Sequence, residues 1–116
     1  MRVAIIGSRD FNDYELVQKT LNPVKEKITL IVSGGARGAD SLGARYAKDN
    51  QIETSIFIPD WDKHGKSAGY IRNKDIVSNC DVVIAFWDGQ SKGTQHSFKL
   101  AKELNKGIKI IKYNEL

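Results

Sequence analysis

The stretch Leu30-Ile31-Val32-Ser33-Gly34-Gly35-Ala36-Arg37-Gly38-Ala39-Asp40-Ser41-Leu42 consists of a short apolar strand, a glycine loop and the start of a helix. Glycines at positions 34, 35 and 38 let backbone amides approach a ligand without obstruction by side chains. The first turn of the helix adds unpaired N–H groups and a partial positive charge. This arrangement predicts an anion-binding loop. The alternative is that the glycines serve only tight packing, because the pattern is not the dinucleotide-binding fingerprint.

Two further glycine loops follow apolar runs elsewhere in the chain. Gly7-Ser8-Arg9 comes after the run at residues 3–6, and Asp88-Gly89-Gln90-Ser91-Lys92-Gly93-Thr94 comes after the run at residues 81–86. Three strand ends therefore carry the same kind of loop. This repetition favours ligand binding over tight packing alone.

Length and composition restrict the class of protein. A chain of 116 residues is expected to form a single domain over residues 1–116, and a domain of this size buries roughly two thirds of the surface of its unfolded chain. The single cysteine, Cys80, allows no disulfide framework, and no set of Cys and His residues has the spacing of zinc ligands. We expect no metal and no cofactor.

The start of the chain shows no sign of export. Met1 leads directly into a strand-like segment, without a basic and apolar signal region, and no apolar run has membrane-spanning length. We therefore expect a cytoplasmic protein with no membrane partner. The formal net charge of +4 favours anionic partners. The charges are scattered along the chain, so the excess alone gives weak support for nucleic acid.

Apolar periodicity predicts strands that alternate with helices. The strands are expected at residues 3–6, 29–32, 53–58, 81–86 and 108–111. The helices are expected from a cap at Asn12 to near Pro23, and at residues 39–50, 68–78 and 94–104, with an irregular stretch at 59–69. Asn12 with Glu15 forms the predicted capping pair of the first helix, and Phe11 with Leu16 forms the predicted hydrophobic staple.

This alternation predicts an α/β fold, a single three-layer Rossmann-like domain whose five-stranded parallel sheet carries helices on both faces. Continuous apolar runs predict that residues 3–6, 30–32 and 82–86 are the most buried strands. If the strand order is 3-2-1-4-5, the loops after the first, second and fourth strands are neighbours at the carboxyl edge, where such sheets bind ligands. Several amide donors around one pocket predict a phosphate-bearing ligand.

Several groups of residues resemble those of known nucleotide-binding proteins. Ser33-Gly34-Gly35-Ala36-Arg37-Gly38-Ala39-Asp40 closely resembles the Ser-Gly-x-Ala-Arg-Gly-x-Asp motif of the DprA/Smf proteins. Asp88-Gly89-x-x-Lys92-Gly93-Thr94 resembles a divergent form of the Pro-Gly-Gly-x-Gly-Thr motif of the LOG (lonely guy) phosphoribohydrolases. Both belong to the SLOG superfamily of nucleotide-binding Rossmann-like domains. Together with Gly7-Ser8-Arg9 and Asp60-Trp61…Gly65…Ala68-Gly69…Arg72-Asn73, the motifs resemble the small stand-alone YspA-like branch, over nearly the whole chain.

The resemblance implies a role for Arg72. It corresponds to the catalytic arginine of the LOG proteins, although Asn73 replaces the lysine that follows that arginine. Its spacing from Ala68 and Ile76 places Arg72 beside the apolar stripe of its helix, where a guanidinium group needs an anionic partner. The alternative for Arg72 and Arg9 is an internal salt bridge, which for Arg72 would be to Asp75 or to a carboxylate of residues 60–62. For Arg37 the alternatives are an internal salt bridge and a capping or surface role.

The LOG pattern Gly-Thr-x-x-Glu supplies a carboxylate that stabilises an oxocarbenium ion, and Ser97 stands in its place here. We interpret Ser97 as a small residue packed at a helix start. For carboxylates near strand ends the alternative role is capping, and for Asp40 it is interaction with the helix dipole. For the histidines the alternative is simple solvation. The candidates for a substitute charge or for acid–base work are Asp10, Asp40, Asp60, Asp62, Asp88, His64 and His96.

Aromatic side chains offer a second kind of contact. Trp61 and Tyr70 flank basic residues, so one of them is a candidate for stacking on a nucleobase. The alternative for both, and for Trp87, is packing at the edge of the core or a contact between subunits.

Three functions compete. The residues favour a module that binds a nucleotide-derived small ligand (a nucleotide, an ADP-ribose-like molecule or a cyclic nucleotide signal) as sensor, carrier or sequestering protein. The second function is a nucleotide N-glycosidase or phosphoribohydrolase, with Arg72 as catalytic residue. The third is DprA-like binding of single-stranded DNA, which the lack of a basic stripe interleaved with aromatic residues disfavours. The resemblance also implies a homodimer or higher homo-oligomer. The expected ligand-binding residues are Gly7, Ser8, Arg9, Gly34, Gly35, Arg37, Gly38, Asp40, Arg72, Asn73, Gly89, Lys92, Gly93 and Thr94.

Overall fold

A computed structural model describes residues 1–113 of the chain. Strands and helices alternate along it, as the apolar periodicity predicts. The elements are β1 (Arg2–Gly7), α1 (Tyr14–Leu21), the 3₁₀ helix η1 (Asn22–Lys27), β2 (Leu30–Ser33), α2 (Ala39–Asp49), β3 (Glu53–Ile56), α3 (Trp61–His64), the 3₁₀ helix η2 (Gly65–Ser67), α4 (Ala68–Ser78), β4 (Val82–Trp87), α5 (Lys92–Glu103) and β5 (Gly107–Lys112).

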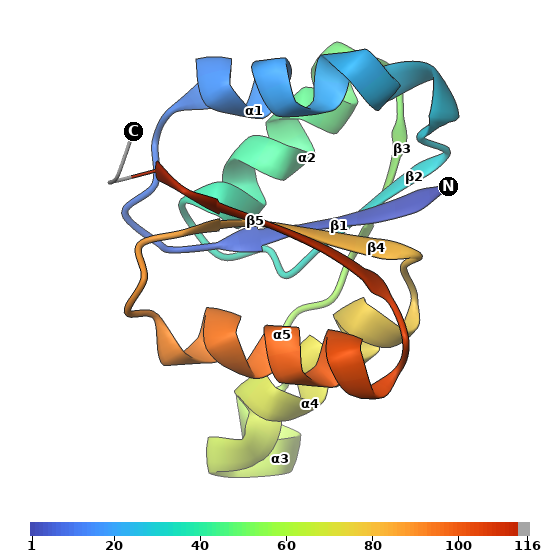
Figure 1. The fold of residues 1–116 in the computed structure, drawn as a ribbon. Coiled ribbons are helices and arrows are strands. Elements are labelled where there is room, and N and C mark those ends of the chain that lie inside the picture. The colour runs from blue at the N-terminus through green and yellow to red at the C-terminus, as the bar shows by residue number, and fades with distance from the viewer. Residues whose placement is uncertain (114–116) are drawn as a thin grey trace.

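The five strands form one parallel sheet in the order β3-β2-β1-β4-β5. β1 is central, and its Val3 is paired with Ile31 of β2 on one side and with Val82 of β4 on the other. Figure 1 shows α1 and α2 on one face of the sheet and α4 and α5 on the other. The predicted fold class, strand order and parallel arrangement are confirmed.

Alternate residues of the central strands build two cores, because successive side chains of a strand point to opposite faces. Val3 and Ile5 pack in the core that contains Tyr46 of α2, and Ala4 and Ile6 pack in the core that contains Ile76 of α4. Full burial of one Val or Ile side chain contributes about 1.5–3 kcal/mol. β1, β2 and β4 are the most buried strands, as predicted, and β3 and β5 form the more exposed edges.

The start of α1 differs from the prediction by one residue. The cap is Asp13, whose carboxylate accepts a hydrogen bond from the Leu16 N–H at 3.1 Å. The prediction of Asn12 as the cap, with Glu15 as its partner, is therefore wrong. The predicted hydrophobic staple depends on that cap and is wrong as well. Phe11 and Leu16 still contact the core beneath α1 and α2. A carboxylate is favoured at the cap because its charge also interacts with the helix dipole.

Other helical segments also differ from the prediction. Residues 59–69 contain α3 and η2, and Asp60 caps α3 by accepting a hydrogen bond from the Lys63 N–H at 3.1 Å. Beyond α1 the chain continues as η1 through Pro23. α5 begins at Lys92 rather than Thr94, because Ser91 is its cap. In residues 1–113 no helix is long and apolar enough to cross a bilayer.

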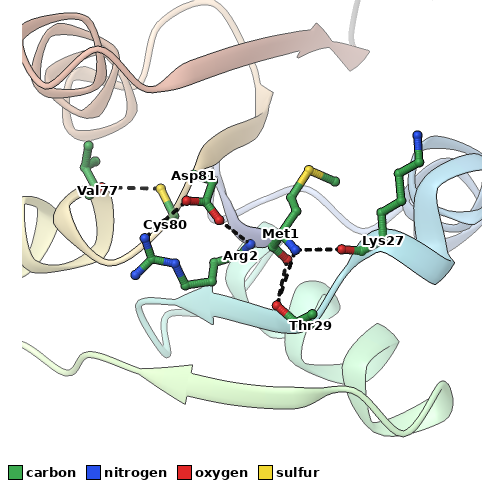
Figure 2. Close-up of polar contacts among 7 residues, drawn as sticks. All are labelled: Met1, Arg2, Lys27, Thr29, Val77, Cys80 and Asp81. Carbon is green, nitrogen blue, oxygen red and sulfur yellow. Dashed lines mark hydrogen bonds and ion pairs between the residues drawn. The ribbon is translucent and has the colours of Figure 1, made fainter.

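Contacts within the protein close the amino end of the sheet (Figure 2). The Asp81 carboxylate accepts hydrogen bonds from the Arg2 N–H at 2.7 Å and from the Arg2 guanidinium at 3.1 Å. The hydrogen bond from the Arg2 side chain is the main cause that lowers the pKa of Asp81. The Met1 ammonium donates to the Lys27 carbonyl at 2.7 Å, and the Thr29 N–H donates to the Met1 carbonyl at 2.9 Å. These bonds tie β1 to β4 and to the segment before β2.

Candidate functional site

A cavity of about 430 Å³ opens at the carboxyl edge of the sheet. Its walls come from the loops after β1, β2 and β4, from the first turns of α2 and α5, and from one side of α4. The volume lies within the range of roughly 300–1,000 Å³ that is usual for small-molecule sites. The three loops converge there because β1 lies between β2 and β4 in the sheet.

Ser8 joins the three loops. Its N–H donates to the Phe86 carbonyl at 3.0 Å, and its hydroxyl oxygen accepts a hydrogen bond from the Asp88 N–H at 3.0 Å. Its carbonyl accepts hydrogen bonds from the N–H groups of Phe11 and Ala39, both at 3.3 Å. Ser8 is buried, so one residue fixes the end of β1 relative to the end of β4 and the start of α2.

Glycine is required at two positions where these loops approach each other. Gly7 has a φ of 153°, and a Cβ atom there would collide with the Phe86 carbonyl. Gly38 has a φ of 83°, and a Cβ atom there would collide with the carbonyl oxygens of Ser8 and Arg9. Both glycines therefore allow close backbone packing, whatever ligand the loops hold.

Arg72 reaches from α4 to the loop that follows β2. Its Nη1 donates to the Gly34 carbonyl at 2.8 Å, and its Nε donates to the Oδ1 atom of Asn73 at 3.1 Å. The Nδ2 atom of Asn73 in turn donates to the Gly93 carbonyl at 3.4 Å. Burial lowers the pKa of Arg72, but a guanidinium group stays charged in proteins. Arg72 thus bonds to Gly34 and Asn73 rather than to Asp75 or to a carboxylate of residues 60–62.

Asp40 is buried in the first turn of α2, with 7% of its surface exposed. Its Oδ2 atom accepts a hydrogen bond from the Ala36 N–H at 3.3 Å. Burial raises the pKa of Asp40 to about 6, against the lowering effects of that hydrogen bond and of the charges on Arg72 and Arg9. A Cβ atom on Gly34 would lie 2.7 Å from this carboxylate and 2.5 Å from Nη1 of Arg72. Asp40 therefore lies beside the cations of the cavity as well as in the first turn of α2.

Asp88 and Ser91 shape the loop between β4 and α5. The Oδ1 atom of Asp88 accepts hydrogen bonds from the N–H groups of Gln90 and Ser91, both at 2.8 Å, and these bonds lower the pKa of Asp88. The Ser91 hydroxyl accepts a hydrogen bond from the Thr94 N–H at 3.4 Å. Ser97 is buried, and its hydroxyl donates to the Gly93 carbonyl at 3.4 Å. This position matches the interpretation of Ser97 as a small residue packed at the helix start.

The cavity walls carry charges of both signs. Arg9, Arg37 and Arg72 supply positive charge, and Asp10, Asp40 and Asp88 supply negative charge. Arg9 and Arg37 are exposed, whereas Arg72 is half-buried and anchored. Asp10 is held by the Tyr113 hydroxyl, which donates to it at 2.6 Å. The mixture suits a ligand that offers both an anionic group and hydrogen-bond donors.

The structure brings most of the expected ligand-binding residues together. Those that line the cavity are Gly7, Ser8, Arg9, Arg37, Asp40, Arg72, Asn73, Gly93 and Thr94. Those that lie nearby without lining it are Gly34, Gly35, Gly38 and Gly89 in the adjoining loops and Lys92 at the start of α5. The roles of all these residues in binding stay predictions.

Sequence reasoning missed some lining residues, of which Ser91 is the most informative. A serine three residues before Thr94 has the spacing of a helix cap, so the capping rule was the available signal. Ile6, Ala36 and Ile76 also line the cavity, and no pattern distinguishes them from ordinary core residues.

Other candidates lie away from the cavity. Asp60, Asp62 and Trp61 surround a separate shallow depression. Trp87 packs edge-to-face against Phe98 and donates its indole N–H to the Ser91 carbonyl, so it stabilises the loop. Trp61 and Tyr70 are 57% and 59% exposed.

The two histidines have different surroundings. The Nδ1 atom of His96 lies 3.5 Å from Nδ2 of Asn73, and the His96 ring packs edge-to-face against Tyr70. The His64 carbonyl accepts a hydrogen bond from the Ser67 hydroxyl at 2.9 Å. In the part of the chain that the structure describes, no group of three or more His, Cys, Asp or Glu residues is placed to hold a metal ion.

The fold and the cavity define a doubly wound α/β domain with a ligand-sized site at the carboxyl edge of its sheet. The model of the YspA, cpYpsA-related SLOG family matches residues 1–64. The chain belongs to this family, as its motifs predict. It is also 36% identical to the Gene 61 protein of Mycobacterium phage D29, over an alignment of 123 positions that covers 98% of this chain and 97% of that protein.

Two solved structures share the fold. DNA processing protein A (DprA) from Streptococcus pneumoniae superposes with a TM-score of 0.78 at 21% identity, covering 94% of this chain and 49% of that protein. DprA from Helicobacter pylori, whose structure concerns its single-stranded DNA binding mode, superposes with a TM-score of 0.75 at 22% identity, covering 100% of this chain and 71% of that protein. The chain therefore spans about half the length of the pneumococcal protein.

Proposed function

We propose that this protein binds a nucleotide-derived small molecule in the cavity at the carboxyl edge of the sheet. The observation that carries the proposal is the convergence of three loops and of Arg72 on one cavity. Backbone N–H groups at helix starts and guanidinium groups are the usual ligands of phosphate in proteins. Membership of the SLOG family supports the same class of ligand.

The charges of the cavity favour a sugar phosphate over a bare polyphosphate. In the proposed complex the phosphate lies near Gly7, Ser8, Gly93 and Thr94, and Arg72 pairs with an anionic group. Asp10, Asp40 and Asp88 would repel a ligand that is anionic throughout, but their oxygens accept hydrogen bonds from sugar hydroxyl groups. A nucleotide, an ADP-ribose-like molecule or a cyclic nucleotide offers both kinds of group.

We expect binding without cleavage. Breaking a ribosyl bond builds positive charge on the sugar, and a facing carboxylate lowers that barrier by electrostatic stabilisation. The Ser97 hydroxyl supplies no such charge, and it is already bonded to the Gly93 carbonyl. N-glycosidic hydrolysis is the competing function, with Arg72 as catalytic residue and a cavity aspartate supplying the charge.

Binding of single-stranded DNA is a second candidate, supported by the fold shared with DprA. Grooves for single strands normally combine basic residues with aromatic side chains on which bases stack. Among the described residues that line the cavity, none is aromatic. This composition favours a small ligand over a strand.

Calorimetric titration with AMP, cyclic AMP, ADP-ribose and a short oligothymidylate tests these functions together. Charge-assisted hydrogen bonds contribute about 1.5–3 kcal/mol, so Arg72→Ala should weaken nucleotide binding about tenfold or more. Lys48→Ala, on the exposed outer side of α2, is the control and should bind normally. Arg72→Lys keeps the charge and should retain part of the affinity.

Two results would change the assignment. Oligothymidylate binding that is tighter than nucleotide binding and is lost in Arg72→Ala would assign the cavity to DNA. Chromatography of the same mixtures reports released base, and turnover that disappears in Arg72→Ala would make the protein a hydrolase. Equal affinity in Arg72→Ala and Lys48→Ala would remove Arg72 from the site.

We further propose a cytoplasmic homodimer that shelters Trp61 and Tyr70. Both side chains are exposed on neighbouring helices, and aromatic residues are enriched at subunit contacts. Light scattering at tens of micromolar should give the mass of two chains, and the mass of one chain would contradict the proposal.

A further inference from the structure

A second depression, of about 600 Å³, lies between α5 and the edge strand β5. It shares no lining residue with the cavity described above. We call it the α5–β5 groove. Its apolar lining comes from Trp87, Phe98, Ile108 and Ile110, and its basic lining comes from Lys99 and Lys102.

The apolar part of the groove is unusually open for a small domain. Ile108 and Ile110 are 37% and 44% exposed, although both belong to a strand of the sheet. They lie two residues apart and therefore on the same face of β5. Beside them, Trp87 and Phe98 pack edge-to-face with ring centroids 5.2 Å apart. The indole N–H of Trp87 already donates to Ser91, so the ring offers the groove apolar contact.

The outer edge of β5 offers hydrogen bonds. Within the described sheet, β5 is paired with β4 alone and is the last strand. In residues 107–111 the backbone N–H and C=O groups that point away from β4 therefore have no neighbouring strand in the described part of the chain. An exposed strand edge of this kind is a template for pairing with another extended chain.

The positive charge of the protein gathers at this edge. From Gln95 to Tyr113 the chain has five lysines and one glutamate, an excess of four charges that equals the formal excess of the whole chain, +4. Two of these lysines, Lys99 and Lys102, line the groove. Lysines along an edge strand oppose pairing between identical edges, because equal charges meet.

The charge and the apolar lining of the α5–β5 groove together indicate which kind of molecule it binds. A second copy would bring lysines against lysines, and a nucleic acid strand would leave the exposed isoleucines without apolar partners. An extended segment whose alternate side chains include both apolar and acidic residues places both kinds on the face toward α5. There they match the apolar lining and the two lysines of the groove, and the backbone of the segment matches the open strand edge. We propose that the α5–β5 groove binds such a segment of another protein, which adds to β5 as a sixth strand.

Fluorescence anisotropy with a labelled peptide of about eight residues, the length of a long strand, tests this proposal. In the probe every second residue is isoleucine, valine or glutamate, so that these side chains share one face of the strand, and threonine stands between them. One control peptide carries lysine in place of glutamate, and a second carries N-methyl groups on the backbone amides of one edge. A single-stranded oligonucleotide of about twelve nucleotides is the competitor of different chemistry.

The variants test charge and apolar contact separately. Lys99→Glu with Lys102→Glu reverses the charge of the groove, and Lys19→Glu with Lys48→Glu makes the same change of net charge on exposed residues of α1 and α2. Ile110→Ser removes apolar contact in the groove. Ile58→Ser, at a site 75% exposed outside the groove, is its control. All six positions are exposed, so the fold should be kept.

We expect the acidic peptide to bind the natural protein and both control variants. Exposed ion pairs contribute about 0.2–1 kcal/mol each, and reversing two lysines replaces attraction by repulsion, so binding should weaken about tenfold. The lysine peptide and the N-methylated peptide should not bind. No binding of the acidic peptide, or equal binding by the groove variants and their controls, would overturn the proposal.

If the groove binds another kind of molecule, the same experiments give a distinct result, and each such result would also overturn the proposal. Oligonucleotide binding that the Lys99 and Lys102 reversals abolish would assign the groove to nucleic acid. A dimer that dissociates in Ile110→Ser would assign it to a second copy. Full binding of the N-methylated peptide would exclude addition of a strand.

Discussion

The two ends of the sheet are built from similar residues but differ in what those residues contact. At the amino end, the Asp81 carboxylate faces the Arg2 guanidinium at 3.1 Å, and the Met1 ammonium is bonded to Lys27 (Figure 2). At the carboxyl end, three arginines and three aspartates surround a cavity of about 430 Å³. The first arrangement pairs charges within the protein, and the second leaves exposed arginines at the mouth of a cavity.

The ends also differ in the charge state that folding favours. The hydrogen bond from Arg2 lowers the pKa of Asp81, so folding favours its ionised form. Burial raises the pKa of Asp40 to about 6, so folding favours its neutral form. A carboxylate whose ionisation destabilises the fold, placed among cations beside a cavity, is typical of functional sites rather than of structural ion pairs. The comparison therefore favours the carboxyl end as the candidate site.

The largest effect is expected from Gly7→Ala, at the junction between β1 and the cavity. A Cβ atom at this position collides with the backbone of Phe86, so the end of β1 must move away from β4. We expect a loss of about 4 kcal/mol or more in the free energy of unfolding, a large part of the stability of a small domain. Urea denaturation measures it.

Gly93→Ala is the matched control for Gly7→Ala. Gly93 also lines the cavity, but it lies in α5, and nothing lies within 4 Å of the position of its Cβ atom. Alanine is the better helix former, so this variant should be as stable as the natural protein or up to about 1 kcal/mol more stable. Similar stability of the two variants would show that the cavity does not depend on the close approach of β1 and β4.

Asp40→Asn should give the next largest effect, which depends on pH. Because the pKa of Asp40 is raised from 3.8 to about 6 on folding, its stabilising contribution is full below pH 4 and is lost as the pH rises through 6. A shift of two units corresponds to about 3 kcal/mol. Asparagine stays neutral, so the variant should match the natural protein at pH 4 and exceed its stability by up to that amount at pH 7.

Denaturation curves from pH 4 to pH 7 test this prediction. The difference between the two proteins isolates Asp40, because the other carboxylates titrate in both. A constant difference across this range would show that Asp40 is ionised throughout. Asp40→Asn should at the same time change nucleotide affinity, whereas a purely structural carboxylate would leave it unchanged.

The smallest effect is expected at the amino end, from Asp81→Asn. Asp81 and Arg2 are exposed, so water screens their attraction, and the amide keeps one acceptor for the Arg2 N–H. We expect a slight fall in the urea midpoint that disappears in about 1 M NaCl, where the Debye length is about 3 Å. Nucleotide affinity should not change. A salt-independent loss of affinity would mean that the two ends are coupled.

The fold was predictable because a buried strand is recognisable in the sequence as a continuous run of apolar residues. β1 and β4 are continuous apolar runs, and the helices between strands show amphipathic spacing. The segments that were predicted wrongly are short or have competing caps. The four residues of α3 are too few to show periodicity. Asn12 and Asp13 are both good caps, so the sequence alone did not decide which of them begins α1.

The site was predictable only in part, since its key contacts join residues that are distant in sequence. The glycine loops identified the cavity, because their position depends on strand order alone. The partner of Arg72 is a carbonyl 38 residues away, which no helical spacing indicates. Asp40 was interpreted through its place in the first turn of a helix, and the burial that raises its pKa follows from packing of the assembled loops.

Ser8 has a consequence for the speed of binding. Because its backbone and hydroxyl hold the three loops in one arrangement, the loops cannot rearrange independently when a ligand arrives. A site that is already assembled loses little conformational freedom on binding. Association should therefore be limited by diffusional encounter, with a single kinetic phase whose rate rises linearly with ligand concentration and shows no plateau.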